Sequence, residues 1–247
     1  MFMRKTALAA SLVLIGASSV FADFTGGAFK WNGKDFYAVA RVDLDSLNGQ
    51  SSNGGAFKVN LLAGSLTPSI YSGVTAPTSN VFTTYCIENG ITFNPGKSGG
   101  YWVSIDPRAY SGNAGASGDP VSDVTQWIYD KWLGGAYTSA EQTAVNEAIW
   151  QAEGESGGSA NYVYTAALSA LGYAANTSPN LFKDATHTHA MNLWDGFLEV
   201  KDSNGDFLYW QASDRQSQLI TVIPAPGVAL LMGLGVGLVG WFKRRLA

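Results

Sequence analysis

Cys86 is the residue best suited to covalent chemistry, and it is the only cysteine of the chain. It follows Tyr85 in a predicted strand over residues 81–87. A lone cysteine has no partner for an internal disulfide, so its thiol is left over. In a later predicted helix, Gln142 and Asn146 are four residues apart, which places their carboxamides on roughly one helix face.

The sequence around these residues resembles the thioester domains of bacterial surface adhesins. The matching segments are Tyr85-Cys86-Ile87-Glu88 and Asn146-Glu147-Ala148-Ile149-Trp150. In that family a strand cysteine is linked to a helix glutamine, and the thioester acylates an amine or a hydroxyl. The resemblance implies that Cys86 supplies the sulfur. Asn146 occupies the glutamine position, and Gln142 is the alternative. The other interpretation is a small buried cysteine beside an ordinary amphipathic helix.

Two further groups of polar residues could bind metal ions. His187 and His189 alternate on a predicted strand near Asp184, but two histidines do not complete a transition-metal site. Residues 202–206 resemble half of a calcium loop and lack the distal glutamate. We therefore interpret the first group as a surface loop and the second as a hairpin turn, and we predict no metal and no cofactor.

Evidence for an enzyme is weak in this sequence. Glu153 and Glu155 are a pair of acids of the kind glycosidases use, but their Gly/Ser-rich setting favours a solvated loop. Tryptophans are numerous, and some could stack on sugars while others fill the core. The six of the central region are Trp102, Trp127, Trp132, Trp150, Trp194 and Trp210.

The N-terminus has the pattern of a secretory signal peptide. Arg4 and Lys5 precede an apolar stretch over residues 7–17, and small residues lead to Ala22. Cleavage is expected between Ala22 and Asp23. Residues 1–22 are therefore predicted to direct export.

The C-terminus has the pattern of a short membrane anchor. Residues 227–242 carry no charge, and a basic tail follows, made of Lys243, Arg244 and Arg245. An apolar segment of this length is close to that of a membrane-spanning helix. The basic tail is expected to stay in the cytoplasm.

The same region resembles the PEP-CTERM sorting signal. Pro224-Ala225-Pro226, the glycine- and leucine-rich span and the basic tail carry the resemblance, with Ala225 in place of the family's glutamate. The family consists of exported proteins of Gram-negative bacteria that exosortase, a membrane transpeptidase, processes. It is associated with exopolysaccharide and biofilm matrix. The resemblance covers only residues 221–247.

Charge and composition describe an exported domain over residues 23–220. Hydrophobic residues make up 46% of the chain and aromatic residues 13%, which excludes intrinsic disorder. Without the five basic residues at the two ends, ten basic residues face nineteen acidic ones, a net charge of −9. Nucleic-acid binding requires basic clusters, so this function is not expected.

The pattern of elements predicts an α+β fold, a β-rich sandwich or barrel-like ectodomain with a helical insertion at about 120–175. Strands are predicted where β-branched and aromatic residues gather. These segments are 35–42, 56–62, 81–87, 101–105, 197–200, 207–210 and 218–222. Asn204-Gly205 between two of them indicates a hairpin.

Three helices are predicted within the insertion. The first is capped by Asp119, with Pro120 at its first position, and ends before Gly134. The second opens with a capping box from Ser139 to Gln142. The third spans about 161–173.

Three functions remain open on the sequence alone. The first is a non-enzymatic surface or matrix protein that contacts polysaccharide or another surface protein. The second is a covalent adhesin that uses Cys86, and the third is an enzyme acting on polysaccharide. Each agrees with export across the inner membrane and with exosortase as a processing partner.

Overall fold

The computed structural model describes residues 26–46, 55–64, 74–75, 81–89, 96–110, 117–155, 161–221 and 223–224. The predicted signal peptide, the cleavage site at Ala22 and Asp23, and the C-terminal segment from Ala225 onward lie outside these residues. That segment includes Pro226, the apolar span and the basic tail of Lys243, Arg244 and Arg245. Among the described residues, no helix combines the length and the apolar character needed to cross a membrane.

Strands are the commonest element in the described chain. They are β1 (Gly27–Trp31), β2 (Lys34–Ala38), β3 (Ala40–Ser46), β4 (Ala56–Gly64), β5 (Val74–Thr75), β6 (Val81–Tyr85), β7 (Tyr101–Asp106), β8 (Arg108–Ala109), β9 (Asp119–Pro120), β10 (Thr188–Lys201), β11 (Phe207–Thr221) and β12 (Ile223–Pro224). The helices are α1 (Asp123–Leu133), α2 (Gln142–Ala152) and α3 (Tyr162–Leu171), with 3-10 turns η3 (Ser139–Glu141) and η4 (Pro179–Leu181). The sheet-rich mixed fold predicted from the sequence is confirmed at this level.

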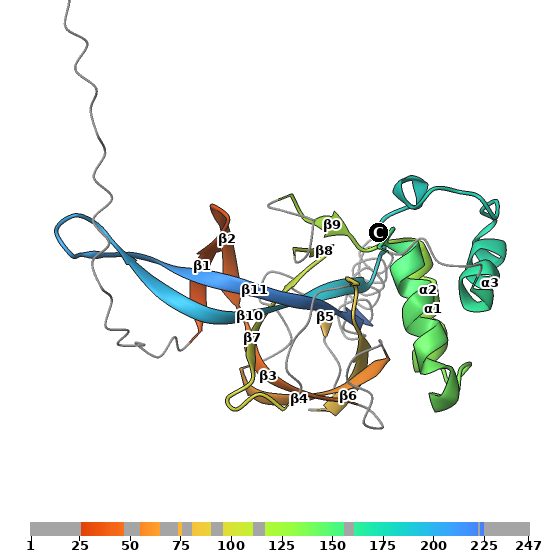
Figure 1. Cartoon of the computed structure of the whole chain (residues 1–247), viewed down its shortest axis with the longest axis horizontal. Helices are drawn as coiled ribbons and strands as arrows, with labels where there is room; N and C mark the ends of the chain where they lie inside the picture. Colours follow the sequence, from red (N-terminus) through yellow and green to blue (C-terminus); the bar gives the residue numbers. More distant parts are fainter. Residues whose placement is uncertain are drawn as a thin grey trace, which may run out of the picture.

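Eight strands form the main sheet in the order β2-β1-β11-β10-β7-β3-β4-β6. All neighbours are antiparallel except β1 and β11, which pair in parallel. The long hairpin of β10 and β11 lies in the middle of this order and extends well past the other strands (Figure 1). The turn of residues 202–206 joins these two strands, so the hairpin prediction is confirmed.

Both ends of the sheet curl back toward its middle strands. Next to β2, the Val39 amide donates to the Val103 carbonyl of β7 at 2.9 Å. Next to β6, Cys86 bridges to Gln218 of β11, and the Ile87 amide donates to the Ser217 carbonyl at 3.0 Å. The curled sheet therefore encloses apolar side chains on its concave sides.

Three groups of buried side chains form the cores. One lies inside the curl of β3, β4, β7 and β10 and includes Val42, Leu44, Val59, Cys86, Val103, Met191 and Leu193. An aromatic one lies beside β1 and β2 and includes Phe29, Trp31, Phe36, Tyr110, Trp194 and Phe197. The third joins the helices to the sheet and includes Tyr85, Ile87, Val124, Ile128, Val145, Ile149, Val163 and Leu219.

The helical insertion is confirmed, but the predicted starts of two helices were wrong. Ser122, rather than Asp119, caps α1, and its side chain accepts a hydrogen bond from the Thr125 amide. Asp119 and Pro120 instead form β9, which pairs with β8. Proline fixes only its own φ, so it suits a short edge strand as well as a helix start.

The capping box at the start of the second helix lies one residue earlier than predicted. Thr138 and Glu141 form it, and they open η3, which continues into α2 at Gln142. Ser139 with Gln142 and Thr138 with Glu141 both place a hydroxyl residue three positions before Glu or Gln. The sequence therefore does not distinguish these two capping boxes. The third helix agrees with the prediction, because Asn161 caps α3 and Gly172 ends it with a φ of 78°.

Candidate functional site

Cys86 lies at the point where β6 closes onto β11, and its side chain is buried. Its thiol donates to the Gln216 Oε1 at 2.8 Å and accepts from the Gln218 Nε2 at 3.2 Å. A separation of 2.8 Å is shorter than an ordinary van der Waals contact between sulfur and oxygen. The sulfur is thus held directly against a carboxamide.

Gln216 is held in place by a second contact. Its Nε2 donates to the Glu88 carbonyl at 2.7 Å, which fixes the orientation of the carboxamide against the sulfur. Gln216 and Gln218 alternate along β11, so both side chains lie on the same face of the strand. The alternation indicates that the two glutamines share a strand face, but the sequence does not indicate that this face meets Cys86.

Burial determines the protonation of this site. It raises the pKa of the Cys86 thiol, and the nearby Glu88 raises it further, although the Gln218 hydrogen bond lowers it. Burial also raises the pKa of Glu88 to about 8, against the opposing effect of its hydrogen bonds from Ser217. Both groups are therefore protonated at neutral pH, and the site holds a thiol instead of a thiolate.

Glu88 is only partly satisfied by hydrogen bonds. Its Oε2 accepts from the Ser217 amide at 2.8 Å, whereas its Oε1 is buried without a hydrogen-bond partner among the described residues. A carboxyl group in this position is tolerated because its proton makes it neutral.

Asn146 and Gln142 approach the Cys86 strand but not its sulfur. The Asn146 Nδ2 donates to the Cys86 carbonyl at 3.0 Å, and its Oδ1 accepts from the Gly55 amide at 2.8 Å. The Gln142 Oε1 accepts from the Ala56 amide at 3.4 Å. The two carboxamides of α2 therefore satisfy backbone groups of the strands beneath them.

The alternation of the strand explains why α2 does not reach the sulfur. Tyr85 and Ile87 pack into the core beneath the helices, whereas Cys86 packs into the core inside the sheet. Successive side chains of a strand point to opposite faces. The helix thus meets the backbone of Cys86 while its thiol faces β11.

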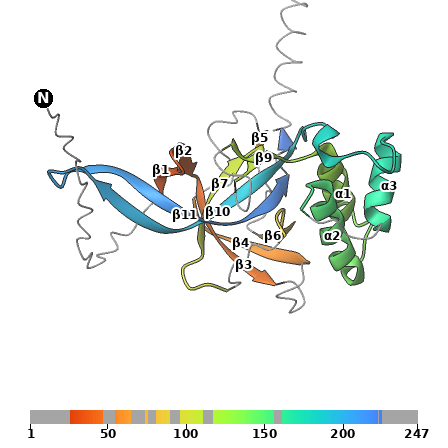
Figure 2. The ribbon, with the colours of Figure 1, turned by 45° about the horizontal axis from the view of Figure 1, so that its top comes forward.

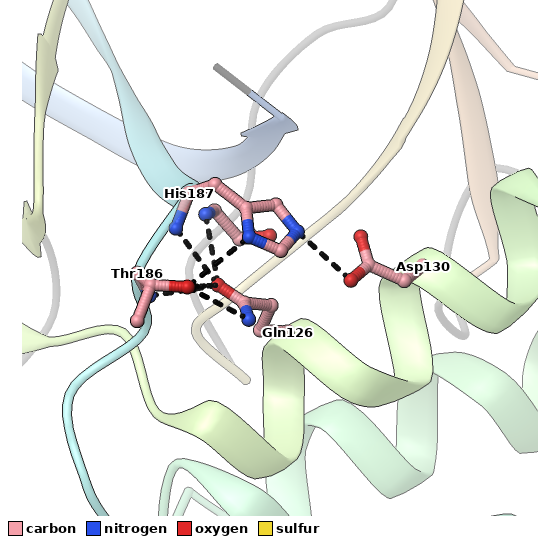
Figure 3. A network of polar contacts seen from close by, with 5 residues as sticks. Gln126, Asp130, Thr186 and His187 are labelled. Carbon is pink, nitrogen blue, oxygen red and sulfur yellow. Dashed lines mark hydrogen bonds and ion pairs between the residues drawn. The ribbon is translucent and has the colours of Figure 1, made fainter. Parts of the chain in front are cut away.

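His187 belongs to a network that joins α1 to the start of β10 (Figure 3). The Gln126 Oε1 accepts from the backbone amides of Thr186, His187 and Thr188 at 2.8, 2.9 and 3.2 Å. The His187 Nε2 lies 2.9 Å from the Asp130 Oδ2. The network is a structural connection between a helix and a strand.

The residues considered for metal binding have other partners. The part of the chain that the structure describes holds no group of three His, Cys, Asp or Glu side chains arranged for a metal ion. His189 is partly buried, and burial lowers its pKa. The Asp202 Oδ1 accepts from the amides of Asn204 and Asp206, as expected of a hairpin turn.

Of the two paired acids, Glu153 has its carboxyl group bonded to the start of α1, so the predicted solvated loop is wrong for this residue. The Glu153 Oε1 accepts from the Ser122 amide and hydroxyl at 3.1 and 3.0 Å and contacts the Thr125 hydroxyl. Burial raises the pKa of Glu153 to about 6, and it also raises the pKa of Glu155. Glu153, Asp119 and Asp184 line a cavity of about 560 Å³.

The tryptophans do not form an exposed platform in the described region. Trp31 and Trp194 are buried, and the other described tryptophans are partly buried. The large apolar side chains that are exposed include Tyr37, Leu198, Phe207 and Leu208. Three of these lie on the β10–β11 hairpin.

Comparisons with protein-family models, with curated proteins and with solved structures found no match for this chain.

Proposed function

We infer that the chain is an exported, exosortase-sorted surface or matrix protein without enzymatic activity, associated with exopolysaccharide or biofilm. The C-terminal pattern carries this proposal, because Pro-Ala-Pro, an apolar span and a basic tail follow each other directly. The last described strand ends at Pro224, the first residue of that motif. The described fold and the sorting motif thus share Pro224.

Processing of an epitope-tagged chain in a Gram-negative host tests this proposal. With exosortase present, the chain is expected to lose its C-terminal tag and to leave the membrane fraction. Without exosortase, it is expected to keep the tag and stay at the membrane. A double change of Pro226→Ala and Arg244→Glu should block processing, whereas Lys58→Glu on the exposed face of β4 should not. Retention of the tag with exosortase would contradict the sorting assignment.

A second candidate function is that of a covalent adhesin, and the contact of 2.8 Å between the Cys86 Sγ and the Gln216 Oε1 favours it. In this function the sulfur attacks the Gln216 Cδ, a thioester forms, and the carboxamide nitrogen leaves as ammonia with the thiol proton. An amine then attacks the same carbon, forms an amide and returns the thiol. The acyl donor is Gln216 of β11 in place of a residue of α2.

Intact mass spectrometry of the purified chain distinguishes the two candidates. A thioester makes the chain lighter by one ammonia, and methylamine restores the mass and releases one thiol. Gln216→Ala should abolish this loss, as should Cys86→Ser. Gln218→Ala is the matched control, because it removes the neighbouring carboxamide but leaves the acyl donor. A full mass with one titratable thiol after denaturation would exclude the covalent function and leave the first proposal intact.

A further inference from the structure

The β10–β11 hairpin ends in a two-stranded arm. β7 pairs with β10 only as far as Trp194, and β1 pairs with β11 at Gln211. Beyond Trp194, within the described ranges, β10 pairs only with β11, and at the tip of the arm residues 199–201 pair with residues 207–210. Figures 1 and 2 show this arm extending away from the body of the molecule. A ribbon of two strands has two open edges and is barely stable alone in water.

The outer edge of β10 presents the backbone of Glu199 and Lys201. At the end of the arm, the Asp202 amide donates to the Asp206 carbonyl at 2.9 Å, so the backbone of Asp202 faces β11. Hydrogen-bonding direction alternates along an antiparallel strand. The groups of Val200 therefore also face β11, and those of Glu199 and Lys201 face away from it.

These two residues make the edge complementary to itself. If a second β10 aligns antiparallel with a two-fold axis at Val200, each Glu199 lies opposite the Lys201 of the other copy. The outward-facing backbone groups of the same residues then form the hydrogen bonds between the strands. The two ion pairs and the ladder thus require the same register.

The side chains on the arm also suit this pairing. Glu199 and Lys201 contact each other at 3.0 Å within one chain, but both are exposed, so the contact adds little and can be exchanged. Leu198 and Val200 share the opposite face of the strand, and in the aligned pair Val200 lies opposite its copy. Leu198, Phe207 and Leu208 are 57%, 51% and 54% exposed.

We propose that the arm is a self-association edge through which two copies of this chain join β10 to β10 over residues 198–202. The contact is isologous, because the same residues on each copy meet across a two-fold axis. It adds two strands to each arm and converts two ribbons into one sheet of four strands.

Charge reversal tests the proposed register. Sedimentation velocity of the full chain in mild detergent, over a range of concentrations, should show a dimer. Glu199→Lys and Lys201→Glu each place like charges opposite one another twice, so each variant should dimerise roughly tenfold more weakly. An equimolar mixture of the two variants should associate as strongly as the unmodified chain, because every pair is then of opposite sign.

The controls separate this edge from other contacts. Lys58→Glu, an exposed change on β4, should leave dimerisation unchanged. Hydrogen exchange should show the amides of Glu199 and Lys201 becoming protected as concentration rises. A chain that stays monomeric throughout, or a dimer that ignores both charge reversals, would overturn the proposal. The second result would mean that the copies meet elsewhere, including through the C-terminal segment.

Discussion

At the scale of single residues, the carboxamides decide how this fold closes. Gln216 and Gln218 hold the Cys86 sulfur, while Asn146 joins the Cys86 carbonyl to the Gly55 amide. Each of these side chains is buried, so water cannot supply the hydrogen bonds that it makes. Buried polar groups without partners cost more than the net gain of a hydrogen bond, so these positions tolerate few replacements.

Asn146→Ala is expected to destabilise the fold by about 2–3 kcal/mol, since it leaves a buried carbonyl and a buried amide without partners. Urea unfolding would measure the change in the free energy of unfolding. Glu147→Ala, on the exposed side of the same helix, is the matched control and should change it by less than about 0.5 kcal/mol. Equal effects of the two changes would refute the role assigned to Asn146.

Glu88 should make stability depend on pH. Its pKa is about 8 in the fold, against an ordinary value of 4.5, because it is buried. A raised carboxyl pKa adds stability that is complete below about pH 4.5 and is lost as the pH rises toward about 8. We expect the free energy of unfolding to fall by a few kcal/mol across this window.

Glu88→Gln should flatten this dependence, because the amide stays neutral at every pH. Chemical unfolding at several values between about pH 5 and pH 9 would measure it. Glu153, with a pKa of about 6, should leave a smaller slope in both proteins at the acidic end. Parallel profiles for the variant and the unmodified chain would show that Glu88 is not the group responsible.

At the scale of elements, Gln126 is one of the side chains that connect the helical insertion to the sheet. Gln126 of α1 accepts from three consecutive backbone amides at the start of β10. The neighbouring contact between His187 and Asp130 is partly exposed on both sides. The two interactions should therefore contribute differently to stability, because solvent screens the contact between His187 and Asp130.

Gln126→Ala is expected to cost about 1–2 kcal/mol of stability, as it removes an acceptor shared by three amides. Asp130→Asn should cost less than about 1 kcal/mol. Thermal or urea unfolding of both variants provides the comparison. A larger loss for Asp130→Asn would reverse the ranking and assign the connection to the contact between His187 and Asp130.

At the scale of the whole molecule, the position of the arm determines the shape of the proposed dimer. β10 has 14 residues and spans about 45 Å, and the body lies around its first half. Antiparallel joining of two arms places the two bodies at opposite ends of the assembly. The dimer should therefore be much longer than it is wide.

Small-angle X-ray scattering would test this shape. The dimer is expected to give a distance distribution with two separated maxima, one within each body and one between bodies. Glu199→Lys, measured at the same concentration, should give the distribution of a single elongated chain. A compact dimer with one maximum would contradict joining at the arms. This holds even if Glu199→Lys and Lys201→Glu had been found to weaken dimerisation.

The sequence by itself determined the local features of this protein. Enrichment of β-branched and aromatic residues located part of the sheet, although β1 was not predicted and β10 and β11 are longer than expected. Asn204-Gly205 located the central hairpin, and Asn161 located the start of α3. These signals act over a few residues, where backbone preference and capping are decisive. The predicted export and sorting segments rest on the sequence alone and stay predictions.

The tertiary structure determined which residues contact one another. The resemblance paired Cys86 with the helix of Asn146, whereas the sulfur faces Gln216, which is 130 residues away in the chain. The sequence pattern cannot give this contact, because it depends on which strand closes the curled sheet and on which face each side chain then takes. The raised pKa of Glu88 and the free edge of the arm have the same origin, since burial and exposure exist only once the strands are placed.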